Sequence, residues 1–393
     1  MSSVNTKPVI LVTGADLAAQ ALALLVDFEI VYAGKTPQLT DVAALARQHN
    51  PVGIIVRYSG VNADVMDAAP ALKVISKHGS GTDTIDKDAA GARGIAVKAA
   101  VGANAAAVAE QALAMLLASA KSIVPLNERM HAGHWDKATH KSMELGGKTI
   151  GLVGLGAIGQ RFAKMVDAMG MRVLGFDPYA KNLPDYIHAV DLATIWRESD
   201  AISLHCPLTA ENKQLINAET LAQCKQGVIF VNTARGGLVD EPALLAAVQS
   251  GQVGMAALDS FAVEPMTALH IFHSHKGFIL SPHIGGVTSD AYINMGVAAA
   301  QNILEGINTN KNLIFNSVFN SLSKDEHFRQ QMTSASTTIL FRRMPEDATQ
   351  AAQQLFATLR ELDQPDIKLI WVETPPEDAV WDGVRDRVTR AAA

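Results

Sequence analysis

The chain has 393 residues, of which 48% are hydrophobic and 18% charged, as in a globular protein with room for two or three domains. Its net charge of −6 gives no support to nucleic-acid binding, and neither a signal-peptide pattern nor a membrane-length apolar run is found in the sequence. Cys206 and Cys224 lack metal-ligand spacing and are too few for a disulfide scaffold. Taken together, these features lead us to expect a cytoplasmic protein that binds no metal, no nucleic acid and no membrane.

The first hundred residues alternate short apolar runs with helical patterns, which predicts a parallel sheet with helices on both faces. Strands are expected at residues 9–13, 29–32, 53–57 and 73–77, and helices at 17–26, 39–49 and 63–69. Residues 104–130 contain no glycine and are rich in Ala, Leu and Met, so they predict one long helix.

Six further strands with helices between them predict a second, doubly wound sheet. They are expected at residues 149–153, 172–176, 201–205, 228–232, 255–259 and 278–281. Ligands of such sheets bind at the carboxyl ends of the strands, so the residues at those ends should meet in one crevice. These residues are Gly154, Asp177, Pro207, Ala234, Asp259 and His283.

The end of the chain is expected to form a small β-α-β-α extension. A helix is predicted at residues 289–306 and a polar linker at 308–335. The extension, residues 336–393, would hold strands at 338–342 and 368–373 and helices at 348–363 and 379–392.

The segment from Lys148 to Gly159, KTIGLVGLGAIG, is the most informative in the chain. It predicts a strand, a glycine turn and a helix start, which is the layout of a dinucleotide site. Gly154 allows the sharp turn, Gly156 lets the backbone approach a pyrophosphate, and Gly159 lets the helix pack close to the strand. The N–H groups at the start of the helix would face the phosphates. A plain tight strand–helix turn is the structural alternative.

The choice between NAD and NADP depends on Asp177, which ends the next predicted strand. Its carboxylate can accept hydrogen bonds from ribose hydroxyls and would repel a 2′-phosphate. No arginine occurs in residues 178–181, and Lys181 is the one cation there that could weaken the repulsion. We therefore expect NAD as the cofactor.

Three later segments place an arginine, a carboxylate and a histidine just beyond successive strand ends. They are NTARGG at 232–237, DSFAVEP at 259–265 and SPHIGG at 281–286. Arg235, Glu264 and His283 are therefore candidates for an acid–base site. The structural alternatives are a surface arginine, a turn cap before Pro265 and a strand-end histidine with ordinary partners. A further group of histidines, at 270, 273 and 275, lies in a predicted loop, where we expect no metal.

These three segments and the glycine turn resemble the D-isomer-specific 2-hydroxyacid dehydrogenases. Four motifs occur in the order and spacing of that family, and the similarity covers roughly residues 50 to 310. The match is closest to the phosphoglycerate dehydrogenase branch, with hydroxypyruvate and glyoxylate reductases as near relatives. The resemblance implies a flavodoxin-like substrate domain at 4–103 and 287–322, a Rossmann NAD domain at 104–286, and a homodimer joined partly by the long helix.

The resemblance also implies roles for individual residues. His283 would be the proton donor or acceptor, Glu264 would raise its pKa, and Arg235 would bind the substrate carboxylate. The loop KHGSG at 77–81 matches the substrate loop of the family, where the N–H groups of Ser80 and Gly81 would bind the same carboxylate. The expected cofactor contacts are Gly154, Gly156, Ala157, Ile158, Gly159, Asp177, Pro207, Thr233, Ala234, Asp259, His283, Gly285 and Gly286; for Asp259, capping of a strand end is the alternative.

Arg57 ends a predicted strand at the place where phosphoglycerate dehydrogenases have an arginine near the substrate phosphate. Arg57 is therefore a candidate for substrate binding. An ordinary ion pair is the equally weighted alternative.

The C-terminal residues depart from this family and instead resemble the C-terminal end of threonylcarbamoyl-AMP synthases. The matching segments are FRRMP at 341–345, LRELD at 359–363, IWVE at 370–373 and DRVTRAA at 386–392. They include none of that enzyme's catalytic part, so we transfer no activity.

The motifs and the resemblance lead us to expect an NAD-dependent oxidoreductase, with D-3-phosphoglycerate or a close relative as its substrate. A hydroxypyruvate or glyoxylate reductase is the alternative within the family. A formate dehydrogenase would have a neutral amide in place of Glu264. An NAD-sensing, corepressor-like binding protein is the alternative from another class, and turnover of keto acids would separate the two.

Overall fold

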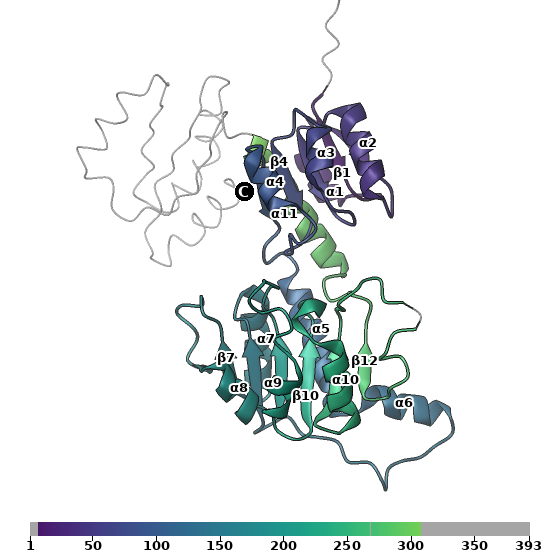
Figure 1. The fold of residues 1–393 in the computed structure, drawn as a ribbon, viewed down its shortest axis with the longest axis vertical. Helices are drawn as coiled ribbons and strands as arrows, with labels where there is room; N and C mark the ends of the chain where they lie inside the picture. Colours follow the sequence, from purple (N-terminus) through teal and green to yellow (C-terminus); the bar gives the residue numbers. More distant parts are fainter. Residues whose placement is uncertain (1–6, 268, 308–393) are drawn as a thin grey trace, which may run out of the picture. The chain divides into compact units, whose positions relative to one another are not determined.

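Two open parallel sheets form the framework of the computed structural model, which describes residues 7–267 and 269–307 (Figure 1). Both sheets belong to one unit that ends at Ile303. The predicted linker at 308–335 and the extension at 336–393 lie outside the described residues. The α/β fold class predicted from the sequence is confirmed by both sheets.

The first sheet has the strand order β2-β1-β3-β4-β5, and all its pairings are parallel. Its strands are β1 (Val9–Val12), β2 (Glu29–Tyr32), β3 (Gly53–Val56), β4 (Val74–Lys77) and β5 (Ala96–Ala99); its helices are α1 (Ala19–Leu24), α2 (Leu39–His49), α3 (Ala63–Asp67) and α4 (Lys87–Ala92). The four predicted strands and three predicted helices are confirmed. The short edge strand β5 and α4 were not predicted, because the sequence AVKA offers no continuous apolar run.

The second sheet has the order β12-β11-β10-β9-β6-β7-β8. Its strands are β6 (Thr149–Val153), β7 (Arg172–Phe176), β8 (Ile187–Ala189), β9 (Ala201–Leu204), β10 (Val228–Asn232), β11 (Val253–Leu258) and β12 (Phe278–Leu280); its helices are α7 (Ala157–Ala168), α8 (Leu192–Glu198), α9 (Ala218–Ala222), α10 (Glu241–Gln249) and the 3₁₀ turn η1 (Gly236–Leu238). The chain runs outward from β6 in both directions, so the order reverses between β6 and β9. Ligands bind at such a reversal in doubly wound sheets.

The core of the second sheet explains why its strands form. Every residue of β6, β9 and β10 is buried, as expected for parallel strands covered on both faces. On one face, Ala109, Ala112 and Leu116 of helix α5 (Ala105–Ala120) pack in one cluster with Ile150 and Phe162. The small alanine side chains let α5 lie close to the sheet.

The single long helix predicted over residues 104–130 is wrong. The structure contains α5 and a separate helix, α6 (Ile123–His131), bent by 61° at the break. Ser122 lies between them in the left-handed region, with φ of 51°, which interrupts the helical hydrogen bonding. Within the described part of the chain no single helix is long and apolar enough to cross a membrane, although α5 and α6 taken together have the length and composition of a broken span.

The last described helix, α11 (Ser289–Ile307), returns the chain to the first sheet (Figure 1). The side-chain amide of Asn302 donates to Ser76 Oγ at 3.3 Å and to the carbonyl of Ala99 at 3.1 Å. Ile303 fills the space beside Gly53, where a Cβ would lie 3.0 Å from its Cδ1. These contacts support a discontinuous first domain, although its exact boundaries stay a prediction.

Candidate active site

The glycine turn between β6 and α7 has the geometry that each of its glycines was expected to allow. Gly154 has a φ of 98°, and a Cβ there would lie 2.5 Å from the backbone nitrogen of Cys206. A Cβ on Gly159 would lie 2.1 Å from the carbonyl oxygen of Gly154, so the helix can pack this closely only without a side chain. A Cβ on Gly156 would meet no atom within 4 Å, which leaves open space beside the turn.

The start of α7 can bind an anion in this open space. Its first internal hydrogen bond runs from Gln160 N–H to the carbonyl of Gly156 at 3.0 Å. The N–H groups of Ala157, Ile158 and Gly159 precede that bond and belong to the first turn, whose donors have no partner within a helix. Such N–H groups bind phosphates, as in other dinucleotide sites.

Asp177 follows β7 and closes the glycine turn from the neighbouring strand. Its carboxylate accepts hydrogen bonds from the N–H groups of Leu155 at 2.7 Å and Tyr179 at 2.9 Å. The side chain is half-buried, so it keeps a solvent-facing part beside the turn. A ribose-binding acid is expected at this place in a dinucleotide site, and the ribose contact of Asp177 stays a prediction.

The loop after β10 contains a buried polar atom without a hydrogen-bond partner. Asn232 is fully buried, accepts a hydrogen bond from Ala234 N–H at 3.0 Å and donates one to the carbonyl of Arg235 at 2.9 Å. These two bonds fix the loop, a role of Asn232 that was not predicted from the sequence. Thr233 Oγ1 is buried without a hydrogen-bond partner. A buried hydroxyl in this state fits a polar ligand such as the expected cofactor. Pro207 lies just beyond β9, the strand next to β10.

Asp259 holds the loop that carries His283. It is 1% exposed, and its carboxylate accepts hydrogen bonds from the Ser281 hydroxyl, Ile284 N–H at 2.9 Å and Gly285 N–H at 2.7 Å. His283 has a φ of 54°, an uncommon backbone conformation that these bonds stabilise. Asp259 therefore organises the loop, and its expected cofactor contact stays a prediction.

Gly285 and Gly286 lack side chains where neighbours approach closely. A Cβ on Gly285 would lie 2.9 Å from Asp259 Oδ2, and one on Gly286 would lie 2.8 Å from Asn104 Nδ2. Their predicted cofactor contacts are not needed to explain why glycine occurs there.

His283 and Glu264 form an ion pair at the predicted acid–base site. His283 Nδ1 lies 2.7 Å from Glu264 Oε2, while Glu264 Oε1 accepts a hydrogen bond from Phe261 N–H at 2.9 Å. The hydrogen bond with Glu264 raises the pKa of His283 above its ordinary value, although partial burial and the Arg235 charge oppose this. Burial would raise the pKa of Glu264, but hydrogen bonds from His283 and Phe261 leave it lowered.

Arg235 contacts the predicted substrate loop of the first sheet. Its Nε donates to Asp83 Oδ2 at 2.8 Å and its Nη1 to the carbonyl of Ala234 at 2.8 Å. A Cβ on Gly81 would lie 1.7 Å from Arg235 Nη2, so the guanidinium occupies the space beside this glycine. The structure thus brings together Arg235 and Gly81 as expected, and it adds Asp83, the only acidic residue between His78 and Ile85. The Ser80 hydroxyl donates to Asn104 Oδ1 at 3.0 Å.

Arg57 is held by partners of its own, as in the ion-pair alternative. Its Nη1 contacts both the carboxylate and the carbonyl of Asp16, and its Nη2 donates to the Tyr58 hydroxyl at 3.1 Å. The guanidinium carbon lies 4.9 Å from the centre of the Tyr58 ring and 5.0 Å from that of Tyr292. Only 9% of the Arg57 side chain is exposed. A substrate role for Arg57 stays a prediction that must account for these contacts.

Lys77 is a second cation near the substrate loop. Its Nζ donates to the carbonyl of Arg57 at 2.9 Å. Burial, and then the charge of Arg235, lower the pKa of Lys77 to about 8. This lowered pKa was not predicted, because a lysine at a strand end is usually solvated.

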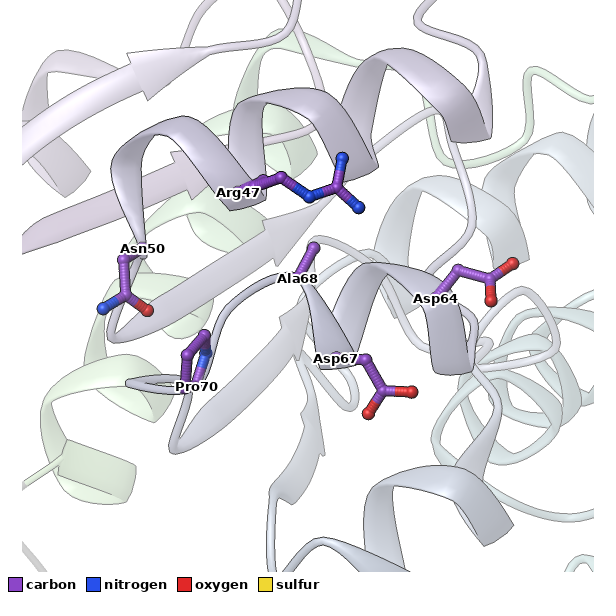
Figure 2. Close-up of a pocket in the computed structure, with 6 residues that line it drawn as sticks. All are labelled: Arg47, Asn50, Asp64, Asp67, Ala68 and Pro70. Carbon is purple, nitrogen blue, oxygen red and sulfur yellow. The ribbon is translucent and has the colours of Figure 1, made fainter.

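A metal site and a surface hollow were also considered as candidate sites. Among the described residues, no group of three or more His, Cys, Asp or Glu side chains could hold a metal ion. A surface hollow of about 590 Å³ lies beside α2 and α3, lined by Arg47, Asn50, Asp64, Asp67, Ala68 and Pro70 (Figure 2). It includes none of the candidate site residues, and Asp67 is paired with Arg93 at 2.7 Å.

The fold and the site together define a class of protein. Residues 113–285 match the family model of the NAD-binding domain of D-isomer specific 2-hydroxyacid dehydrogenases. The chain belongs to this family of NAD-dependent oxidoreductases. A second family model, the C-terminal domain of threonylcarbamoyl-AMP synthase, matches residues 294–393, in agreement with the resemblance of the end of the chain.

Individual relatives have different names within this class. Hydroxypyruvate reductase of Thermotoga maritima is 42% identical over 247 residues, which cover 62% of this chain and 81% of that protein. D-3-phosphoglycerate dehydrogenase of Mycobacterium leprae is 38% identical over 299 residues, which cover 75% of this chain but only 56% of that protein. Among solved structures, a glyoxylate reductase from Paecilomyes thermophila is similar, with a TM-score of 0.68 and 27% identity over 77% of this chain and 96% of that one.

Proposed function

We propose that the protein interconverts a D-2-hydroxy acid and its 2-keto acid, with D-3-phosphoglycerate or a close relative as the first candidate substrate. The observation that carries the proposal is the His283–Glu264 pair, formed at 2.7 Å on the same sheet as the glycine turn and influenced by the charge of Arg235. Proton transfer, carboxylate binding and cofactor binding can therefore take place at one edge of the second sheet.

The mechanism assigns a separate task to each side chain. His283 Nδ1 faces Glu264, so Nε2 is the ring nitrogen that gives a proton to the keto oxygen during reduction or takes it during oxidation. Glu264 stabilises the protonated ring, because an adjacent anion favours the charged form of histidine. NAD, when bound, supplies or accepts the hydride. Thr233 and the first turn of α7 are the groups that would hold it.

Substrate binding is proposed for Arg235 and the loop at Ser80 and Gly81. The contacts of Nε with Asp83 and of Nη1 with Ala234 leave the outer N–H groups of Nη1 and Nη2 for a carboxylate. A planar guanidinium can bind both oxygens of a carboxylate at once. This fixes the acid so that its reacting carbon presents one face to the hydride.

Hydroxypyruvate or glyoxylate is the second candidate substrate. It is supported by Arg57, whose charge is already compensated by Asp16 and therefore less available to a phosphate. It is also supported by the high coverage of the Thermotoga reductase, 81% of that protein.

A keto-acid panel with NADH tests both candidates. The expected result is turnover of 3-phosphohydroxypyruvate, hydroxypyruvate, glyoxylate or pyruvate, with most of it lost in His283→Asn and NADH binding kept. If 3-phosphohydroxypyruvate is the substrate of choice, Arg57→Ala should raise its KM about ten- to a hundredfold and hardly affect glyoxylate, because a charged hydrogen bond is worth about 1.5–3 kcal/mol. Binding of NADH without turnover of any keto acid would favour the NAD-sensing alternative.

We also infer a homodimer in the cytoplasm. The dimer is supported by exposed apolar side chains on and after α6, namely Ile123 at 54%, Met130 at 52% and Trp135 at 76%. The cytoplasmic location is supported by the two free cysteines. Light scattering of the purified chain and fractionation of the source cells would test the two inferences separately.

A further inference from the structure

The loop between β11 and β12 carries Glu264 and must hold its carboxylate against His283. Loops of this kind are usually mobile, so a catalytic side chain on one needs support from fixed elements. Glu264 is 34% exposed; its carboxylate contacts His283 and accepts a hydrogen bond from Phe261 N–H. The next amide of the loop, Ala262 N–H, is bound by a different carboxylate.

That second carboxylate is Glu241, the first residue of α10. Its Oε1 accepts a hydrogen bond from Ala262 N–H at 2.9 Å, and its Oε2 lies 3.3 Å from His270 Nε2. The side chains of Glu241 and His270 are each 14% exposed. One carboxylate thus binds the loop at residues 262 and 270, on both sides of Glu264.

The ring of His270 is itself fixed by its surroundings. Its Nδ1 accepts a hydrogen bond from Phe272 N–H at 3.4 Å, so the proton of a neutral ring is on Nε2, where it is donated to Glu241. The ring centre lies 4.8 Å from that of Phe272 and 6.0 Å from that of Phe261. Phe272 is 1% exposed and stacks on Phe278 at 4.3 Å, so the contact continues into the core.

The Arg235 loop contacts the same backbone. A Cβ on Gly236 would lie 1.8 Å from the carbonyl carbon of Phe261 and 2.4 Å from the nitrogen of Ala262. The backbone at 261–262 is therefore in contact with both Gly236 and Glu241. Its displacement would move Phe261 N–H, which is one of the two partners of Glu264.

We propose that Glu241 is a positioning residue for the reaction and acts, together with His270, by holding the backbone at 261–264 so that Glu264 stays on His283. This rests on the proposed role of His283 as proton donor and acceptor. Glu241 does not touch the reacting atoms. The groups that set the protonation of His283 are Glu264, Asp259 and Arg235, and Glu241 acts through the first of these.

The test is the pH dependence of kcat/KM for keto-acid reduction in Glu241→Ala, Glu241→Gln and His270→Ala. In Glu241→Ala, kcat should fall about ten- to a hundredfold, a part of the usual contribution of a general acid. The alkaline decline of the pH profile of kcat/KM should move to lower pH, because His283 loses its proton more readily when Glu264 is displaced. The KM for NADH should stay the same. The kcat and the pH profile of Glu241→Gln should lie between those of the parent and of Glu241→Ala, because the amide oxygen of the new side chain can still accept a hydrogen bond from Ala262 N–H. Glu219→Ala is the matched control, since Glu219 is also an acid in the first turn of a helix, α9, where its N–H donates to the capping residue Asn217.

Two further measurements separate a positioning role from general damage and from a wrong function. In a Glu264→Gln background, Glu241→Ala should cause no further shift of the pH profile, because its route of action is already removed. NMR titration of His283 needs no substrate and should show a lower pKa in Glu241→Ala than in the parent. An unchanged His283 titration, or equal pH shifts with and without Glu264, would overturn the proposal. A parent enzyme that reduces no keto acid, with the titration shift present, would instead overturn the proposed function alone.

Discussion

The guanidinium of Arg235 and the backbone of Gly81 are in contact although 154 residues separate them in the sequence. A Cβ at residue 81 would lie 1.7 Å from Arg235 Nη2 and 3.0 Å from Asp83 Oδ2. The loop that follows β4 and the loop that follows β10 therefore fit together only because residue 81 lacks a side chain. In the proposed function, the N–H donors of both loops would surround one substrate carboxylate.

Gly81→Ala should displace Arg235 and weaken substrate binding. We expect KM for the keto acid to rise at least tenfold, about the loss of one hydrogen bond to a charged group, while the affinity for NADH is unchanged. Steady-state kinetics and NADH fluorescence titration would measure both. Gly91→Ala is the control, because a Cβ there meets no atom within 4 Å. Similar losses in both variants would show that the effect belongs to folding and not to Arg235.

Glu264→Gln should shift the pH profile of both directions of the reaction. The hydrogen bond with Glu264 raises the pKa of His283, so its protonated form persists to higher pH in the parent. Without the anion that pKa falls, and the alkaline decline of reduction should begin at lower pH. Oxidation needs the unprotonated ring, so the increase of the oxidation rate with pH should also begin at lower pH. Rate profiles from pH 5 to pH 10 would measure both limbs, and opposite shifts in the two directions would contradict a shared histidine.

Asp177→Asn should reduce the preference for NADH over NADPH. The amide keeps an oxygen that can accept from Leu155 N–H, but it removes the charge that would repel a 2′-phosphate. We expect KM for NADH to rise. The ratio of kcat/KM for NADH to kcat/KM for NADPH should fall by about tenfold or more, since one charged hydrogen bond is worth about 1.5–3 kcal/mol. A parent enzyme that already prefers NADPH would refute the ribose-binding role.

His78 should make the folded protein less stable in mild acid. Burial, together with the charge of Arg57, lowers the pKa of His78 from 6.5 to about 4, and the residue is 8% exposed. His78 therefore binds a proton below about pH 6.5 in the unfolded chain, but only below about pH 4 in the folded protein. Stability is complete above the unfolded pKa and is lost as the pH falls through this window, by roughly 2 kcal/mol at pH 5.

Urea unfolding at pH 7.5, 6 and 5 would measure this effect in the parent and in His78→Gln. The variant has its own stability, but its free energy of unfolding should depend less steeply on pH. The same slope in both proteins would assign the acid sensitivity to other groups.

The sequence determined those features that depend on neighbouring residues. The glycine turn is an example, because the φ of Gly154 and the close approach of Gly159 to Gly154 arise within six residues, and their steric requirements can be read directly from the glycine spacing. Buried strands such as β6 and β10 were equally readable as apolar runs. The roles of Arg235, Glu264 and His283 were inferred by resemblance, and the structure supplies the contacts that such roles need.

Tertiary structure alone decided what happens between distant segments. The edge strands β5 and β8 form because a neighbouring strand offers hydrogen bonds, not because their own sequences are apolar. Arg57 is paired with Asp16 across 41 residues, and Arg235 with Asp83 across 152. Glu241 reads as an ordinary first-turn acid of α10 until the fold brings the Glu264 loop against it. A charged side chain can reach many partners, and only the packing of the two sheets and their loops selects among them.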